Sequence, residues 1–361
     1  MKATQRLHDL GQSLWLDNIT RDLLTSGTLR RYRDELSVTG LTSNPTIFDL
    51  AIRNGNSYDE SIRKKTAQGK SGEELFFELA LEDLTQAADL FRPIFDSTNS
   101  IDGWVSLEVS PLLAYDTAKT IKEVAELHAR SKRPNVLIKI PGTGEGVPAI
   151  EESTFQGVPV NVTLLFSREQ YIAAAEAYMR GIERRIAAGR DPKIHSIASV
   201  FISRWDKAVI GKVPELLRNR LGIAIAKRTY KTYRDLLKSA RWQKLAAAGA
   251  VPQRLLWGST GTKDPAAPDV MYIEALAAPD TVNTIPEKTL LAFADHGQVK
   301  GVMPADGGDA EQVLAEFALA GVHHAELAEE LQREGAEAFD RSWNDLMDCL
   351  RSKSEELQKA S

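Results

Sequence analysis

The stretch from residue 135 to residue 165, NVLIKIPGTGEGVPAIEESTFQGVPVNVTLL, decides the fold class. Short apolar runs rich in β-branched side chains open and close it, at residues 135–141 and 158–165. A longer segment of helical character lies between the two runs. A strand, a helix and a second strand in this order form the repeating unit of α/β proteins with a parallel sheet.

The same alternation recurs along the whole chain and predicts eight strands. They are expected at residues 13–18, 38–44, 103–110, 135–141, 158–165, 197–203, 254–260 and 280–286. Apolar residues at helical spacing predict a helix over residues 117–130, and the Ser-x-x-Gln sequence from Ser167 to Gln170 is typical of a capping box that begins another. Eight such units favour a closed (β/α)8 TIM barrel over an open, doubly wound sheet.

We expect residues 1–361 to form a single domain, a barrel with additional helices. Helical insertions are predicted near residues 56–95 and 213–248, and a helical tail near residues 310–361. Within the tail, residues 326–359 are rich in Glu, Lys, Arg and Leu and carry an apolar stripe. The stripe predicts that the tail packs on the outside of the barrel.

Composition narrows the class of function. The net charge of −5 is spread over 45 basic and 50 acidic residues, so no long basic face indicates nucleic acid or an anionic membrane as partner. Cys349 is the only cysteine, which excludes an internal disulfide and a cysteine-based zinc cluster and favours a reducing compartment. No apolar run approaches the roughly 18 residues of a membrane span, and no secretory signal is recognisable. We therefore expect a cytoplasmic protein with a small, soluble substrate.

Polar side chains stand at or just beyond the predicted carboxyl ends of the strands. Active sites of (β/α)8 barrels lie at this end, so these side chains are the candidates for chemistry. In chain order they are Asp17, Asn44, Glu108, Lys139, Asn161, Thr163, Ser199, Arg204 and Lys263.

Lys139 is the sharpest single signal, because it lies between Ile138 and Ile140 in a strand that reads as buried. Burial disfavours the ammonium form of a lysine, and a neutral amine is what a Schiff-base nucleophile requires. A structural ion pair with Glu108 or Asp17 is the alternative. Two carboxylates at the same barrel end could equally supply the acid and the base that imine chemistry needs. Asp17 alone could instead cap the following helix.

The remaining candidates are suited to binding. Asn44, Asn161, Thr163 and Ser199 are short neutral groups that can fix sugar hydroxyls or a catalytic water, although each could be a turn residue. Arg204 and Lys263 follow the sixth and seventh strands, where barrel enzymes frequently hold a phosphate; solvated surface cations are the alternative.

Two other patterns are discounted. Residues 142–146, GTGEG, lack the Gly-x-Gly-x-x-Gly spacing of a dinucleotide-binding loop and are followed by Pro148. His323 and His324 have no accompanying ligand set for a metal. We predict neither a metal nor an organic cofactor.

An ordered set of motifs resembles the transaldolase family, within the class I Schiff-base aldolases. Residues 40–48, GLTSNPTIF, resemble the family's Thr-x-Asn-Pro signature, and residues 136–141, VLIKIP, resemble the stretch that bears its Schiff-base lysine. Residues 105–110, 161–167 and 198–204 are similar to further family segments in the same order. The resemblance extends over about residues 14–294.

Carried over position by position, the resemblance implies roles for all these residues. Lys139 would be the Schiff-base nucleophile, Asp17 the base for carbon–carbon cleavage, and Glu108 a proton donor acting through a water that Thr163 helps to hold. The resemblance also implies the binding residues, which are Asn44, Asn161 and Ser199 for the substrate hydroxyls and Arg204 for its phosphate.

The sequence departs from the family pattern in two places. Residues 258–263, GSTGTK, lack the arginine that many relatives carry after strand seven, so this phosphate contact has either shifted to Lys263 or been lost. Residues 108–111, EVSP, replace an Asp and an Arg that often follow the Glu-Val pair, which indicates a divergent subgroup.

The resemblance implies an activity and leaves alternatives open. A transaldolase transfers a dihydroxyacetone unit from sedoheptulose 7-phosphate to glyceraldehyde 3-phosphate, giving erythrose 4-phosphate and fructose 6-phosphate in the pentose phosphate pathway of carbohydrate metabolism. A Schiff-base aldolase that releases free dihydroxyacetone is the nearest alternative. A non-catalytic barrel that binds sugar phosphates is a third. The sequence does not choose between a monomer and a homodimer.

Overall fold

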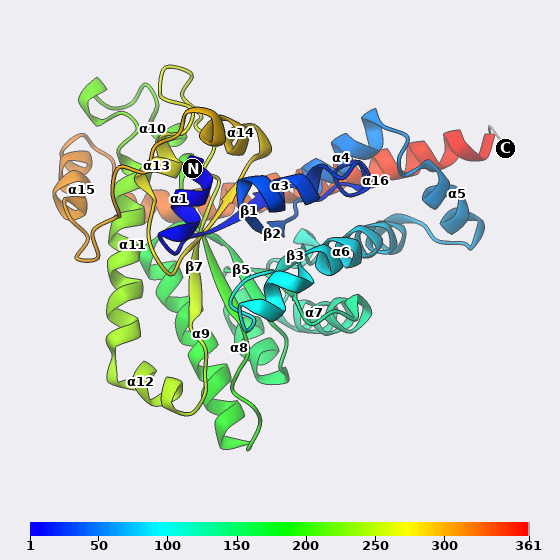
Figure 1. The fold of residues 1–361 in the computed structure, drawn as a ribbon, viewed down its shortest axis with the longest axis horizontal. Helices are drawn as coiled ribbons and strands as arrows, with labels where there is room; N and C mark the ends of the chain where they lie inside the picture. Colours follow the sequence, from blue (N-terminus) through cyan, green and yellow to red (C-terminus); the bar gives the residue numbers. More distant parts are fainter. Residues whose placement is uncertain (360–361) are drawn as a thin grey trace.

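The computed structural model describes residues 1–359 and contains a closed barrel of eight parallel strands (Figure 1). Each strand pairs with its neighbours in chain order, and β8 closes against β1. The strands are β1 (Ser13–Asp17), β2 (Val38–Thr42), β3 (Val105–Glu108), β4 (Val136–Pro141), β5 (Val160–Leu165), β6 (Ser196–Phe201), β7 (Gln253–Gly258) and β8 (Val282–Ile285). The predicted (β/α)8 TIM barrel is confirmed.

Helices alternate with the strands and surround them (Figure 1). They are α1 (Ala3–Asp9), α2 (Arg21–Thr25), α3 (Thr28–Leu36), α4 (Pro45–Asn54), α5 (Asp59–Ala67), α6 (Gly72–Ser97), α7 (Thr117–Ser131), α8 (Gly146–Gln156), α9 (Arg168–Ala187), α10 (Ser203–Val209), α11 (Leu221–Lys238), α12 (Ala240–Ala247), α13 (Met271–Ala275), α14 (Glu287–His296), α15 (Ala310–Leu319) and α16 (His324–Lys359), with short 3₁₀ turns η1 (Pro111–Leu113) and η2 (Glu215–Leu217). The predicted capping box is present, since Ser167 and Gln170 satisfy each other's backbone N–H groups at the start of α9.

An apolar layer inside the barrel supports the polar end. Trp15, Leu137, Ile197 and Val282 belong to one buried cluster within the strands. Side chains two positions apart on a strand point to the same face. The side chains two positions further on therefore form the next layer towards the carboxyl end, and they are Asp17, Lys139, Ser199 and Thr284.

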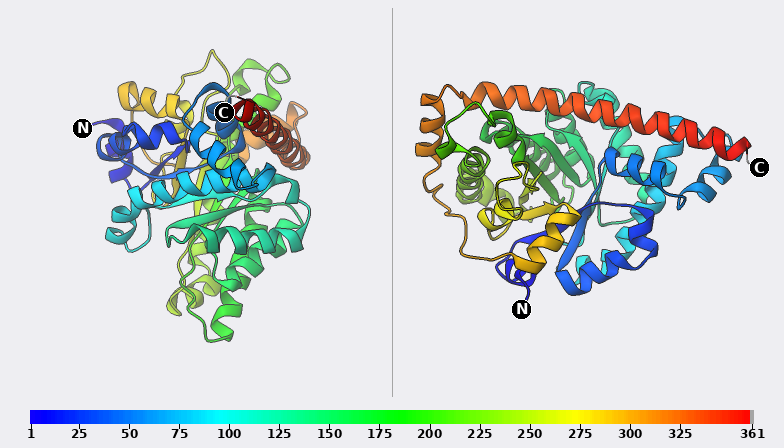
Figure 2. Two further views of the ribbon diagram at one scale, coloured as in Figure 1. Left: turned by 90° about the vertical axis from the view of Figure 1, so that its right-hand side faces the viewer. Right: turned by 90° about the horizontal axis from the view of Figure 1, so that it is seen from above.

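The tail is helical and packs against helices outside the barrel. Its last helix, α16, is 36 residues long and runs along the molecule beside α4, α5 and α6 (Figure 2). Trp343 of the apolar stripe packs against Phe76 and Phe77 of α6, with ring centroids 5.0 and 5.7 Å away. The tail thus packs on helices outside the barrel, as the stripe indicated. Because Ala338, Phe339 and Ser342 line the cavity, α16 also crosses the carboxyl end of the barrel, which the sequence did not predict.

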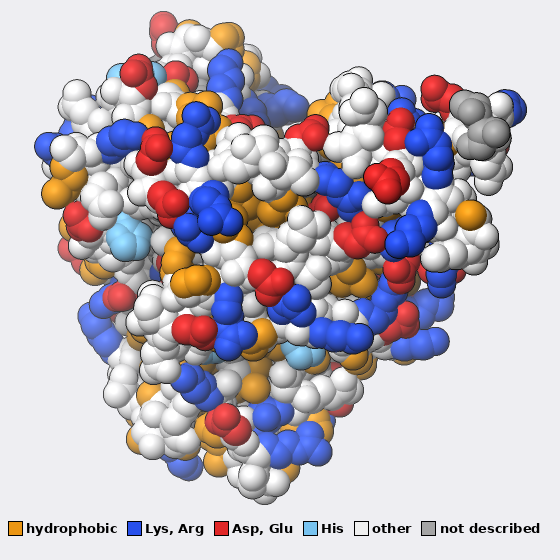
Figure 3. Space-filling model, turned by 45° about the vertical axis from the view of Figure 1, so that its right-hand side comes forward, with side chains coloured by type: hydrophobic (Ala, Val, Ile, Leu, Met, Phe, Trp, Pro, Cys, Tyr) orange, Lys and Arg blue, Asp and Glu red, His pale blue; other side chains and the backbone are white. Residues whose placement is uncertain are grey.

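The predicted insertion regions both contain helices, α5 and α6 in the first and η2, α11 and α12 in the second. On the face shown in Figure 3, basic and acidic side chains are interspersed rather than gathered into a field of one sign. Among residues 1–359, no helix is both long enough and apolar enough to cross a membrane.

Candidate active site

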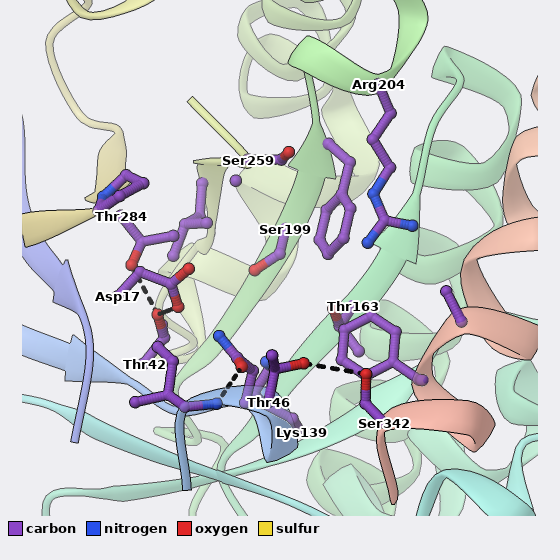
Figure 4. A pocket seen from close by; sticks show the side chains of 18 of the residues that line it. Asp17, Thr42, Thr46, Lys139, Thr163, Ser199, Arg204, Ser259, Thr284 and Ser342 are labelled. Atoms are coloured by element: carbon purple, nitrogen blue, oxygen red, sulfur yellow. Dashed lines mark hydrogen bonds between the residues drawn. The ribbon is translucent and has the colours of Figure 1, made fainter. Parts of the chain in front are cut away.

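A cavity of about 300 Å³ opens at the carboxyl end of the barrel (Figure 4). Seven of the nine predicted site residues line it, and they are Asp17, Asn44, Lys139, Thr163, Ser199, Arg204 and Lys263. The other two, Glu108 and Asn161, lie directly behind this lining and touch it through hydrogen bonds. The structure therefore brings all nine residues together.

Lys139 is held by two acceptors at the base of the cavity. Its Nζ donates to Glu108 Oε2 at 3.1 Å and to the Ser43 carbonyl at 3.0 Å, and its side chain is only 7% exposed. The parallel register places Glu108 of β3 opposite Lys139 of β4, which explains why the two groups meet. Burial raises the pKa of Glu108; Lys139 acts in the opposite direction, and the nearby Asp17 raises it further. Glu108 is thereby biased towards the protonated form of a proton donor.

Asp17 is oriented by threonines rather than by a helix. Thr42 Oγ1 donates to Asp17 Oδ1 at 2.8 Å and lies 2.6 Å from Thr284 Oγ1. Helix α2 begins later, after Thr20, so Asp17 does not cap it. The capping alternative for Asp17 is wrong, and its carboxylate faces the cavity (Figure 4).

The neutral side chains differ in how many of their hydrogen-bonding groups have a partner within the protein. Asn44 caps α4, because its Oδ1 accepts from Ile47 N at 3.1 Å, and it lines the cavity as well. Ser199 donates to Asn161 Oδ1 at 2.7 Å, and Asn161 Nδ2 donates to Ser106 Oγ at 3.1 Å. Asn161 thus lies behind Ser199, and contact with a substrate hydroxyl remains a prediction for it.

Thr163 differs from these residues in its hydrogen bonding. Its hydroxyl is buried and has no hydrogen-bond partner among residues 1–359. Such a group costs roughly 1–3 kcal/mol when it stays unpaired. Since Thr163 lines the cavity beside Lys139, a water or a substrate oxygen is the natural partner (Figure 4).

Two cations, Arg204 and Lys263, line the cavity. Arg204 makes no hydrogen bond or ion pair within the described chain, and its guanidinium lies 5.2 Å from the centre of the Phe201 ring. Burial lowers the pKa of Arg204, which Glu334 partly offsets. The pKa of Lys263 is lowered by partial desolvation and then by the charges of Arg204 and Lys207, although this side chain reaches solvent. Mutually repelling cations without a paired carboxylate form a site for an anion.

Several lining residues were missed by sequence reasoning. Thr42 and Thr284 could have been found, because both are polar residues at strand ends like those selected. Phe201 and Ser259 lie beside the selected Ser199 and Lys263. The three lining residues of α16, which are Ala338, Phe339 and Ser342, follow no strand and carry no such signal.

Comparisons with known proteins agree with this geometry. The family model described as Transaldolase/Fructose-6-phosphate aldolase matches residues 14–350. The transaldolase of Parafrankia sp. (strain EAN1pec) is 44% identical over 359 residues, covering 97% of each chain, and that of Arthrobacter sp. (strain FB24) is 42% identical over 99% of each. The transaldolase of Thermobifida fusca (strain YX) is 43% identical over 95% of this chain and 96% of its own. The chain belongs to the transaldolase/fructose-6-phosphate aldolase family, which confirms the resemblance seen in the sequence.

Proposed function

We propose that this protein is a transaldolase, a transferase that moves a dihydroxyacetone unit between sugar phosphates through a Schiff base on Lys139. The observation that carries the proposal is the arrangement around the Lys139 amine. The amine is buried at the base of the cavity, Glu108 lies 3.1 Å from it, and Asp17 faces the same cavity. An amine flanked by a donor and a base is what both halves of the reaction require.

The first half of the reaction forms the imine. The neutral Lys139 amine attacks the ketose carbonyl carbon, and proton transfer from nitrogen to oxygen gives a carbinolamine. Glu108 then donates a proton, through a water held by Thr163, to the carbinolamine hydroxyl, which leaves as water. The raised pKa of Glu108, caused by burial, suits this role because it favours the protonated form that a proton donor needs.

The second half breaks and remakes a carbon–carbon bond. Asp17 removes the proton of the C4 hydroxyl, the C3–C4 bond breaks, and its electron pair moves into the iminium to give an enamine. The aldose phosphate leaves, while the three-carbon unit stays on Lys139. Addition to a second aldehyde phosphate reverses these steps, and hydrolysis of the new imine restores the amine.

Binding follows the same layout. Arg204 and Lys263 would hold the substrate phosphate, and Asn44, Ser199 and Asn161 the hydroxyls of the dihydroxyacetone unit. We propose sedoheptulose 7-phosphate as the donor and glyceraldehyde 3-phosphate as the acceptor, in the cytoplasmic pentose phosphate pathway. The curated relatives described above all carry the name transaldolase, which favours transfer over release of free dihydroxyacetone.

Trapping tests the proposal directly. The protein is incubated with fructose 6-phosphate, reduced with borohydride and mapped by peptide mass, with Lys139→Ala as the control. We expect a three-carbon adduct on Lys139 and none in the control. Addition of erythrose 4-phosphate before reduction should discharge the adduct into sedoheptulose 7-phosphate. Folded protein without an adduct would instead indicate the sugar-phosphate-binding barrel.

A further inference from the structure

One side chain of α16 joins the ends of two strands of the active site. Gln332 Nε2 donates to the Gly142 carbonyl at 3.0 Å and to the Leu164 carbonyl at 2.9 Å. Gly142 follows the last residue of β4, the strand that carries Lys139, and Leu164 directly follows Thr163 in β5. A half-buried amide from the far end of the sequence therefore bonds to the backbone just after the Lys139 strand and just after Thr163.

The backbone that Gln332 contacts is irregular. Leu164 has a φ of 58°, in the left-handed region that side chains other than glycine rarely adopt, and the pairing of β5 with β6 shifts register between Val162 and Leu165. A conformation of this kind costs of order 1–3 kcal/mol and persists only where its surroundings hold it. Bulges next to active sites serve to re-aim a side chain. Here the side chain beside the bulge is Thr163, whose hydroxyl has no partner in the described chain.

A glycine one turn further along lets the helix come this close. A Cβ atom on Gly335 would lie 3.0 Å from Leu164 Cδ2 and 3.4 Å from Arg204 Nη1. Glycine costs about 1 kcal/mol relative to alanine inside a helix. At this position the helix is therefore less stable, but it can approach Leu164 and Arg204 closely. The same helix therefore approaches the bulge and the cation that would bind phosphate.

We propose that Gln332 is a positioning residue for the transfer reaction, which holds the β5 bulge so that the Thr163 hydroxyl faces the Lys139 amine. The inference rests on the proposed function, because it concerns the water through which Glu108 would deliver its proton. Without the two bonds from Gln332, the carbonyls of Gly142 and Leu164 lose their common donor. The bulge then relaxes, and Thr163 no longer holds the water in place. Loss of the water slows carbinolamine dehydration and leaves phosphate binding unchanged.

The test replaces the donor while keeping the shape. Gln332→Met and Gln332→Glu have similar length, and neither presents the amide donor. We expect both to lower kcat for transfer from fructose 6-phosphate to erythrose 4-phosphate by about tenfold or more, since small misplacements near reacting groups have effects of this size. The KM for fructose 6-phosphate should change less than about twofold, because the phosphate contacts are untouched. Borohydride trapping should still label Lys139, but more slowly.

Two further variants distinguish a positioning role of Gln332 from a general effect of changes in α16 on activity. Gln358→Met makes the same change at an exposed position of α16 and should behave like the wild type. Gly335→Ala presses on Arg204 as well as on Leu164, so it should raise KM severalfold. Circular dichroism establishes whether each variant is folded. If Gln332→Met does not fold, Gln332→Glu tests the positioning role in its place.

The outcomes distinguish this inference from the proposed function. Wild-type protein that forms the adduct, together with folded Gln332 variants of unchanged kcat, overturns the positioning role and leaves the function intact. An equal loss of kcat in Gln358→Met also overturns it, because the effect then belongs to the helix as a whole. Wild-type protein without an adduct overturns both. A selective loss of kcat in the Gln332 variants supports the role.

Discussion

The two ends of the barrel are both polar, but they differ in whether their charged groups find partners within the protein. At the amino end, Asp102 accepts hydrogen bonds from Ser13 Oγ, from Trp15 Nε1 at 2.8 Å and from the Gly103 N–H at 2.9 Å. Arg254 donates to Ser13 Oγ at 2.9 Å and to the carbonyls of residues 101 and 281. This network closes the bottom of the barrel, because each charged group finds its partners within the protein.

The carboxyl end leaves comparable groups without partners. Thr163 Oγ1 is buried and unpaired within residues 1–359, and Arg204 and Lys263 make no ion pair there. Unmet hydrogen-bonding capacity is destabilising unless a ligand or water meets it. The comparison teaches that polarity alone does not mark a site. What marks this site is a cavity lined by cations, Arg204 and Lys263, that have no ion pair within the described residues.

The largest expected effect belongs to Lys139. Lys139→Met should lower the transfer rate by on the order of 10⁴-fold or more and abolish the borohydride adduct, because it removes the amine that lies beside Glu108 and forms the imine. The free energy of unfolding should change far less, since burial raises the pKa of Glu108 and loss of Lys139 removes an influence that lowers it, so the carboxyl is further biased towards its neutral form. A coupled assay and urea unfolding measure the two quantities. Lys212→Met, at an exposed lysine, is the matched control. Residual activity within tenfold of the wild type contradicts the Schiff base.

The opposite pattern is expected at the amino end. Asp102→Ala leaves three donors without their acceptor, so it should lower the free energy of unfolding by about 3 kcal/mol. Well below the melting temperature, kcat of the folded protein should stay within twofold of the wild type. Denaturant unfolding and the transfer assay on one preparation check both statements. A large fall in kcat at unchanged stability would contradict the assignment of stability to the amino end and of catalysis to the carboxyl end.

The amino end also contains a group that responds to pH. His195 precedes β6 and contacts Trp104, with ring centroids 5.0 Å apart and the rings tilted by 46°. Its pKa is lowered to about 4, chiefly by burial. Between its unfolded pKa near 6.5 and about 4, the unfolded chain binds more protons at His195 than the folded protein does. Stability should therefore fall by about 3 kcal/mol as the pH drops through this window. His195→Gln should flatten this part of the stability profile, measured by urea unfolding from pH 4 to 7; an unchanged slope in the variant argues against His195 as its source.

The strands were predictable because each is a buried apolar run with polar or turn-forming residues on both sides. The sequence placed a strand at residues 103–110, and β3 covers Val105–Glu108 within it. The prediction overshot because Gly103 has a φ of 83° and turns the chain before the ladder begins. Apolar character continues past the last ladder hydrogen bond, so it cannot mark where pairing stops.

The site was predictable as far as it follows the strands. Polar residues at strand ends gave Asp17, Lys139 and Ser199, which the closed barrel brings to one cavity. The contributions of α16 were not predictable, since Gln332 contacts Leu164 across 168 positions of sequence. An amphipathic pattern indicates that a helix is half-buried, but not which surface buries it. The sequence therefore placed the tail on the outside of the barrel but did not predict that α16 also crosses the carboxyl end and lines the cavity.

The smallest expected effect concerns the carboxyl end of the barrel. There, the Thr42 hydroxyl is a polar group whose hydrogen bonds are made within the protein. Thr42 has a single proton, which it gives to Asp17, so the Thr284 hydroxyl 2.6 Å away must donate to Thr42. Thr42→Val removes the bond that orients the base and should lower kcat about fivefold, equivalent to about 1 kcal/mol, with little change in KM. Thr284→Val removes only the second bond of the chain and should lower kcat less than twofold. Steady-state kinetics on both variants measures this order. A larger loss in Thr284→Val would reverse the direction of the chain and would mean that Asp17 is held by a different donor.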